Sequence, residues 1–154
     1  MIQRVQSIWL LLAALTLVCL FFFPLMTKNV NNTEYLLYID GHHQSIKEAG
    51  TNVISVTPIG AMILNGVAIL LCLVCIFQFK NRPMQKRLIM INMVLIIATA
   101  VLTALNASLF PGGFSGALPH IASSLFVLAI LFCLLAVRGI RKDEQLLRSA
   151  DRLR

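Results

Sequence analysis

Four long apolar stretches limit what this chain can fold into more than any other feature. They cover residues 8–26, 59–79, 88–110 and 118–137, and none contains an Asp, Glu, Lys or Arg. A bilayer core about 30 Å thick needs about 20 helical residues, so each stretch is long enough to span it. Backbone groups in lipid must be satisfied within their own segment, which predicts helices. The predicted fold class is an all-α membrane protein, a four-transmembrane-helix bundle formed by residues 1–154 as one domain.

Composition argues against a soluble alternative. Only 12% of the residues are charged and the mean hydropathy is +0.85, whereas a soluble domain has about 25% charged residues. Four fully buried core helices would need a polar shell that this chain lacks. The first stretch exceeds a normal signal-peptide core and is followed by no small-residue cleavage site, so we expect an uncleaved signal-anchor.

Basic residues gather on one side of the predicted bundle. The N-terminal flank, the connection at residues 80–87 and the tail at residues 138–154 hold 11 of the 13 Lys and Arg residues. The other two connections, residues 27–57 and 111–117, hold only Lys28 and Lys47. By the positive-inside rule we expect both termini and the middle connection in the cytoplasm.

The first external connection carries strand signals. Residues 34–39 and 42–46 flank Asp40-Gly41, a strong hairpin signal, and residues 51–56 form a third possible strand. This predicts a small β-containing loop that packs on the helix ends or on a partner, because a lone hairpin is marginal in water. His42, His43 and His120 share this side, but adjacent strand histidines point apart, and whether the three form a site stays open.

The tail is the most charged part of the chain, with nine charges in seventeen residues. Its helical spacing places Leu146, Ala150 and Leu153 on one face, which predicts a cytoplasmic C-terminal amphipathic helix. Mixed charge signs suit a protein partner better than a purely lipid-binding patch, and the lack of aromatic residues disfavours nucleic acid. The residues predicted to dock a partner are Arg4, Arg82, Arg87, Arg141, Lys142, Asp143, Glu144, Leu146, Arg148, Asp151, Arg152 and Leu153.

Neutral polar residues interrupt the middle spans. Asn92, Thr99, Thr103 and Asn106 form one stripe of the third stretch. By depth we expect Asn65 opposite Asn106 and Gln78 opposite Asn92, as hydrogen-bonding contacts between close helices rather than a path for substrate. Cys72-Leu-Val-Cys75 lies in an apolar span, where thiols behave as small hydrophobic groups.

The chain shows no chemistry-bearing motif. No span holds a carboxylate or a lysine, and nucleophile motifs and phosphate loops are missing. We therefore expect no catalytic, cofactor-binding or metal-binding residues and a protein that is not an enzyme. A non-enzymatic accessory or scaffold protein is favoured, with the bilayer, a membrane or cytoplasmic protein, or a second copy as partners, and no nucleic acid. The alternatives are a small oligomeric transporter or channel, and a membrane enzyme acting on lipid or quinone at the external face.

Three segments carry a family resemblance. They are the N-terminal MIQRVQS at residues 1–7, the FKNR at 79–82 with Gln85 and Arg87-Leu88, and the tail RGIRKDE at 138–144 with RSADRLR at 148–154. In these the chain resembles the small four-span inner-membrane proteins of Bacteroidota catalogued as domain of unknown function 4293. The resemblance extends from end to end and implies a multi-pass protein of the cytoplasmic (inner) membrane. It implies no activity, substrate or catalytic residue.

Overall fold

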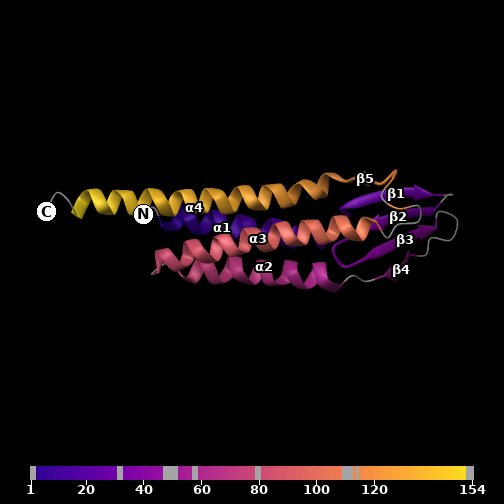
Figure 1. Cartoon of the computed structure of the whole chain (residues 1–154), viewed down its shortest axis with the longest axis horizontal. Helices are drawn as coiled ribbons and strands as arrows, with labels where there is room; N and C mark the ends of the chain where they lie inside the picture. Colours follow the sequence, from indigo (N-terminus) through magenta and orange to yellow (C-terminus); the bar gives the residue numbers. More distant parts are fainter. Residues whose placement is uncertain are drawn as a thin grey trace.

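The computed structural model describes residues 3–30, 33–46, 52–56, 59–78, 81–108, 113 and 115–151. Within them, α-helices run alongside one another and an antiparallel sheet lies at one end of the resulting bundle (Figure 1). In chain order the elements are α1 (Gln3–Cys19), β1 (Met26–Val30), β2 (Thr33–Leu37), β3 (His42–Ile46), β4 (Asn52–Val56), α2 (Ile59–Phe77), α3 (Arg82–Ala107), β5 (Leu118–Pro119), the 3-10 turn η1 (Ile121–Ser123) and α4 (Ser124–Asp151).

Three helical segments of the described chain are long and apolar enough to cross a membrane. They are Ile59–Phe77, Arg82–Ala107 and Ile121–Leu146. The first apolar helix is shorter, because α1 ends at Cys19 and the backbone then turns through bonds from Phe21 N to Val18 O (3.1 Å) and from Phe22 N to Cys19 O (3.0 Å). Its 17 residues extend only about 26 Å. The expected span at residues 8–26 is therefore shorter than predicted, and Met26 already belongs to β1.

The helix of the third apolar stretch begins earlier than the sequence predicts, at Arg82 rather than residue 88. The side chain of Asn81 accepts a hydrogen bond from the Met84 backbone N–H at 3.4 Å, and Pro83 occupies the first turn. Both features favour a helix start. Most of the basic connection at residues 80–87 is consequently helical, and Gln85 and Arg87 lie on α3 rather than in a loop.

The helix of the fourth apolar stretch begins later than predicted and continues further. Leu118 and Pro119 pair with β1, and His120 N donates to Leu25 O at 2.9 Å, so the helix starts at Ser124 and not at residue 118. From there α4 runs unbroken to Asp151. The described part of the tail is therefore helical, as predicted, and continues the helix of the fourth apolar stretch.

The sheet has five strands in the order β4-β3-β2-β1-β5. The predicted pairing of residues 34–39 with 42–46 and the third strand near 51–56 are confirmed. The turn is shifted by one residue, because Tyr38 and Gly41 exchange backbone hydrogen bonds (2.9 and 3.3 Å) around Ile39 and Asp40. Gly41 adopts a φ of +153°, which side-chain-bearing residues rarely adopt. Strands β1 and β5 were not predicted.

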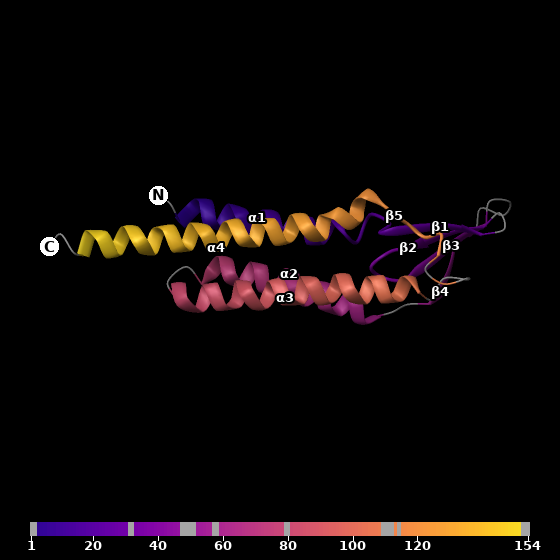
Figure 2. The same ribbon diagram turned by 45° about the horizontal axis from the view of Figure 1, so that its top comes forward.

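The helices are arranged as two adjacent antiparallel pairs (Figure 2). α1 packs on α4, and α2 packs on α3, while further contacts join α1 to α2 and α3 to α4. Small and branched residues fill the centre, including Leu17, Ile96 and Ala129. Large apolar side chains such as Leu70 and Val101 remain exposed on the outer faces. An apolar outer surface of this kind suits contact with lipid rather than with water.

Candidate functional site

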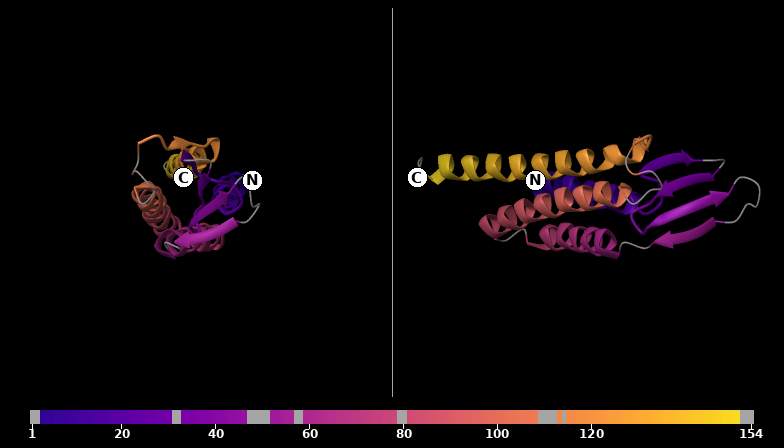
Figure 3. Two further views of the ribbon diagram at one scale, coloured as in Figure 1. Left: turned by 90° about the vertical axis from the view of Figure 1, so that its right-hand side faces the viewer. Right: turned by 45° about the vertical axis from the view of Figure 1, so that its right-hand side comes forward.

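One helix extends beyond the others at the end opposite the sheet. Figures 1 and 3 show the C-terminal part of α4 running past the starts of α1 and α3. We call residues 145–151 of α4 the α4 extension. Residues 138–151, with the adjoining first turns of α1 and α3, are called the basic end. Leu146 is 49% exposed on the extension, and Gln145 is exposed beside it.

Asp143 attaches the base of this extension to α1. Its side chain is only 6% exposed, and its Oδ2 accepts a hydrogen bond from Gln6 Nε2. Gly139, one turn earlier, permits the close approach, because a Cβ there would meet Gln6 Cγ at 3.1 Å. A residue predicted to dock a partner therefore points into the molecule.

Glu144 attaches the extension to α3. Lys86 Nζ donates to Glu144 Oε2 at 2.8 Å, and both side chains are partly exposed. The base of the extension is thus held on two sides, by α1 through Asp143 and by α3 through Glu144. Sequence reasoning missed Gln6 and Lys86 as the partners, since each is far from the tail in the chain.

The remaining predicted docking residues differ in how the structure places them. Arg87, Arg141 and Lys142 are exposed, together with Arg138, while Arg82 is partly buried. These exposed cations lie on α3 and α4, at the same end of the bundle. Several predicted docking groups lie outside the described part, namely the side chains of Arg4, Arg148 and Asp151, and all of Arg152 and Leu153.

The polar residues of the spans lie at helix contacts, with partners that differ from those predicted. Asn65 is fully buried and donates from Nδ2 to Leu17 O of α1 at 3.1 Å. Asn92 donates from Nδ2 to Cys72 Sγ of α2 at 2.9 Å. The expected pairs Asn65 with Asn106 and Asn92 with Gln78 are therefore replaced by bonds to α1 and to a thiol.

The threonines of the stripe bond within their own helix. Thr99 donates to Leu95 O and Thr103 donates to Thr99 O, each at 2.8 Å, and both side chains are buried. Such bonds satisfy a hydroxyl without any partner helix. Asn106 and Gln78, nearer the ends of their helices, are only half-buried.

Sequence reasoning missed Gln85, which extends the same buried face. Its Nε2 donates to Cys75 O of α2 at 2.9 Å. The spacing of the face could have revealed it, because Gln85, Ile89, Asn92 and Ile96 alternate steps of four and three. The same alternation in α4 passes through buried residues and reaches the inward-facing Asp143; these residues are Ala129, Cys133, Ala136, Ile140 and Asp143.

The cysteines are free thiols inside the bundle. Cys72, Cys75 and Cys133 are buried. Asn92 donates to the Cys72 thiol. Among the described residues, no group of three or more His, Cys, Asp or Glu could hold a metal ion.

The three histidines at the sheet end have separate surroundings. His42 is buried, and desolvation lowers its pKa below the ordinary value of 6.5, partly opposed by a hydrogen bond with the Asn106 backbone; nearby His43 lowers it further. His43 Nε2 lies 3.2 Å from Asp40 Oδ1, with its ring edge-on to Tyr38. His120 Nδ1 accepts from Ala122 N at 3.5 Å and so caps η1.

Lys28 is a buried cation that the sequence did not single out. It is 6% exposed on β1, and its Nζ donates to Gly113 O at 2.6 Å. Gly113 has a φ of +70°, a left-handed conformation that favours glycine. The lysine thereby ties the connection between α3 and α4 to the sheet.

Comparison with known proteins supports the family resemblance found in the sequence. No match was found among the curated proteins. A family model described as a domain of unknown function, DUF4293, matches residues 2–153 and so includes the bundle, the sheet and the α4 extension. The chain therefore belongs to the DUF4293 family.

Proposed function

We propose that this chain is a non-enzymatic integral membrane protein that presents the α4 extension to a protein partner. In this proposal it lies in the inner membrane of a Bacteroidota cell, with the basic end in the cytoplasm. The distribution of Lys and Arg supports that orientation. The observation that carries the docking role is the single helix that continues past the bundle while its base is held on two sides.

The two attachments suit docking because they reduce the conformational freedom that binding would otherwise remove. A preorganised binding element loses less entropy when its partner arrives. Beyond the attachments, the exposed surface offers a polar and an apolar side chain, in Gln145 and Leu146. An interface generally combines an apolar centre with a polar rim.

A transporter or channel has less support. Asn92, Thr99 and Thr103 would line its path, yet all three are buried and hydrogen-bonded to neighbouring protein groups. Asn92 bonds across to α2 and stabilises that helix contact, while the two threonine hydroxyls are satisfied within α3. An enzyme at the sheet end has less support as well, because His42, His43 and His120 each interact with different nearby groups.

A truncation after Glu144 tests the docking role, because it removes the extension and leaves both attachments in place. Crosslinking in native membranes followed by affinity purification should show the loss of at least one specific partner. The variant Leu146→Ser should weaken the same partner. Its matched control is Leu118→Ser, an exposed leucine at the sheet end.

Equal thermal unfolding temperatures for the truncated and full chains would show that the loss of a partner is not a loss of folding. An unchanged set of partners for the truncated chain would contradict the proposal. So would a loss of the partner in Leu118→Ser that matches the loss in Leu146→Ser.

A further inference from the structure

A groove lies between α3 and α4 at the basic end. It has a volume of about 460 Å³. A neighbouring hollow of about 490 Å³ on α4 shares Arg138 and Arg141 with it and adds Lys142 and Gln145. The residues that line the groove are Met90, Met93, Leu134, Val137, Arg138 and Arg141.

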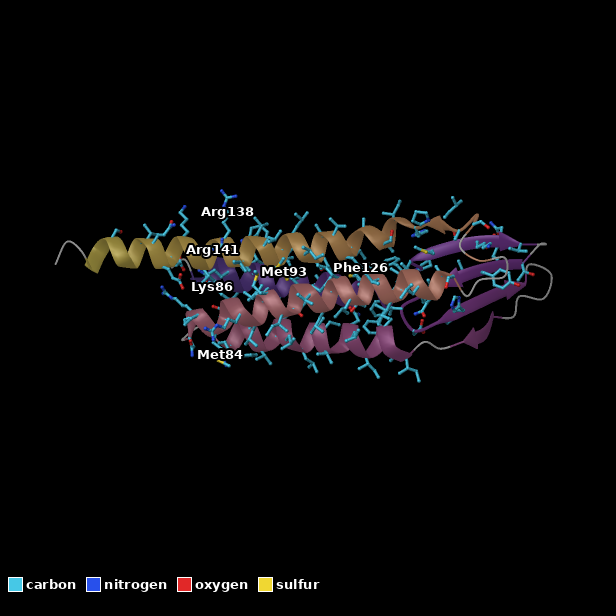
Figure 4. All side chains as sticks on the ribbon, viewed as in Figure 1. Met84, Lys86, Met93, Phe126, Arg138 and Arg141 are labelled. Atoms are coloured by element: carbon cyan, nitrogen blue, oxygen red, sulfur yellow. The ribbon has the colours of Figure 1, made fainter. Side chains whose placement is uncertain are left out.

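The groove is apolar along its walls and cationic at one end. Met90 and Met93 come from α3, and Leu134 and Val137 face them from α4. Figure 4 shows Arg138 and Arg141 on α4, one helical turn apart, with Met93 labelled further toward the middle of the bundle. A ligand that fits must therefore carry a hydrocarbon portion next to an anionic portion.

No carboxylate of the described residues lines the groove or the hollow. The two acidic residues that follow these arginines in sequence bond outside the groove, Asp143 to Gln6 and Glu144 to Lys86. The positive charge of the two arginines is therefore not neutralised within the groove. The Lys86–Glu144 ion pair joins α3 to α4 one turn beyond the groove.

In the proposed membrane orientation, Arg138 and Arg141 would lie near the lipid phosphates of the cytoplasmic leaflet. Arg138 directly follows the apolar run that ends with Val137. A planar guanidinium can donate two parallel hydrogen bonds to a phosphate, which makes arginine well suited to this group. Basic pockets between membrane helices are known to take anionic lipid headgroups.

We propose that the α3–α4 groove binds one anionic phospholipid, with its phosphate on Arg138 and Arg141. An acyl chain lies along the methionines of α3 and the apolar residues of α4. This lipid site is independent of the docking role of the α4 extension, and the full-length chain serves for its test.

The test is native mass spectrometry of the purified full chain, titrated with phosphatidylglycerol or with phosphatidylcholine. We expect phosphatidylglycerol to bind at least about tenfold more tightly than phosphatidylcholine. Both lipids offer a phosphate to the arginines, but only phosphatidylglycerol has a net negative charge that strengthens these hydrogen bonds. The double variant Arg138→Gln/Arg141→Gln should lose about tenfold in affinity for phosphatidylglycerol. Glycerol phosphate, which has the anion without acyl chains, should not compete at equal concentration.

Two matched controls separate a site from general attraction. Arg87→Gln removes an exposed arginine at the same end but outside the groove, and it should change the affinity less than about threefold. Met90→Trp should obstruct the groove and weaken binding without a change of charge. Ile63→Trp replaces a similarly exposed residue on α2 and should leave binding unchanged.

Three outcomes would overturn the lipid site. One is equal binding of the two lipids by the unaltered chain. Another is a loss in Arg87→Gln as large as that in the double variant, which would indicate non-specific surface charge. The third is full competition by glycerol phosphate, which would indicate an anion site without a lipid chain.

Discussion

The two ends of the bundle differ in how far their charged and polar side chains are bonded within the molecule. At the sheet end, Lys28 binds a carbonyl of the neighbouring connection, His42 bonds to the backbone of α3, and His43 meets Asp40. At the basic end, Asp143 and Glu144 are used within the molecule, whereas Arg138 and Arg141 remain exposed. The sheet end is held together by its own contacts, and the basic end presents charge to its surroundings.

The number of charged residues in a segment therefore does not show which of them bond within the molecule and which remain exposed. The acidic residues of the tail were predicted to face a partner because they lie in the most charged segment. In the structure Asp143 and Glu144 bond to α1 and α3, and no carboxylate of the described residues lines the groove beside Arg138 and Arg141. A mixed-charge sequence can therefore produce a surface of one sign.

The largest expected effect comes from removing the donor to the buried carboxylate at the basic end. Gln6→Leu leaves Asp143 buried without that hydrogen bond, and we expect the free energy of unfolding to fall by about 3 kcal/mol. Unfolding in mixed micelles would measure it. The exposed Gln145→Leu is the matched control and should change stability by less than about 0.5 kcal/mol. Equal losses in the two variants would mean that the buried contact does not stabilise the bundle.

The next largest effect should appear at the sheet end. Lys28→Met keeps the length of the side chain but removes its bond to Gly113 O, at an expected cost of about 1–2 kcal/mol. The control is Lys142→Met on the exposed surface of α4, where less than about 0.5 kcal/mol is expected. If Lys142→Met were the more damaging change, the contrast between an internally bonded end and an open end would fail.

A pH-dependent effect should also belong to the sheet end. Burial lowers the pKa of His42, so the folded state binds this proton less readily than the unfolded state does. The protonated unfolded chain is then favoured as the pH falls through 6.5 toward the folded pKa, and stability drops in that window. Thermal unfolding at a series of pH values should show a smaller drop for His42→Gln. The control is the exposed His120→Gln, which should keep the pH dependence of the unaltered chain. An unchanged pH dependence in His42→Gln would show that His42 is not its source.

The smallest effect should come from the partly exposed ion pair at the basic end. Either Lys86→Gln or Glu144→Gln should cost about 0.2–1 kcal/mol, because solvent screens the attraction. The exchange Lys86→Glu/Glu144→Lys should restore part of the loss, and high salt should reduce it. A loss above about 2 kcal/mol would place this pair with the buried contacts rather than with the surface ones.

The apolar stretches predicted the helical part of the fold, and local turn signals predicted the hairpin. The second span at residues 59–79 agrees closely with α2 because Ile59–Phe77 is apolar and free of charge. The sequence hides the early start of α3, because the charges of Arg82 and Arg87 favour a loop. The Asn81 cap and Pro83 are local signals that could have corrected it.

Contacts between distant parts of the chain could not be predicted from one sequence. Strand β1 contains polar residues, Thr27, Lys28 and Asn29, and its pairing with the two-residue β5 depends on the folded bundle. The partner of Asp143 is likewise 137 positions away in the chain. The inward direction of Asp143 was nevertheless readable from the alternating spacing that runs down α4.

The contact between α1 and α4 has a consequence for the order in which the protein is made. Gln6 is synthesised 137 residues before Asp143, a delay on the order of ten seconds at the usual rates of translation. During that interval α1 lacks the helix that later covers it, and β1 lacks β5. The contact between α1 and α4 therefore cannot form until the last part of the chain has been made, whereas α1 can meet α2 earlier.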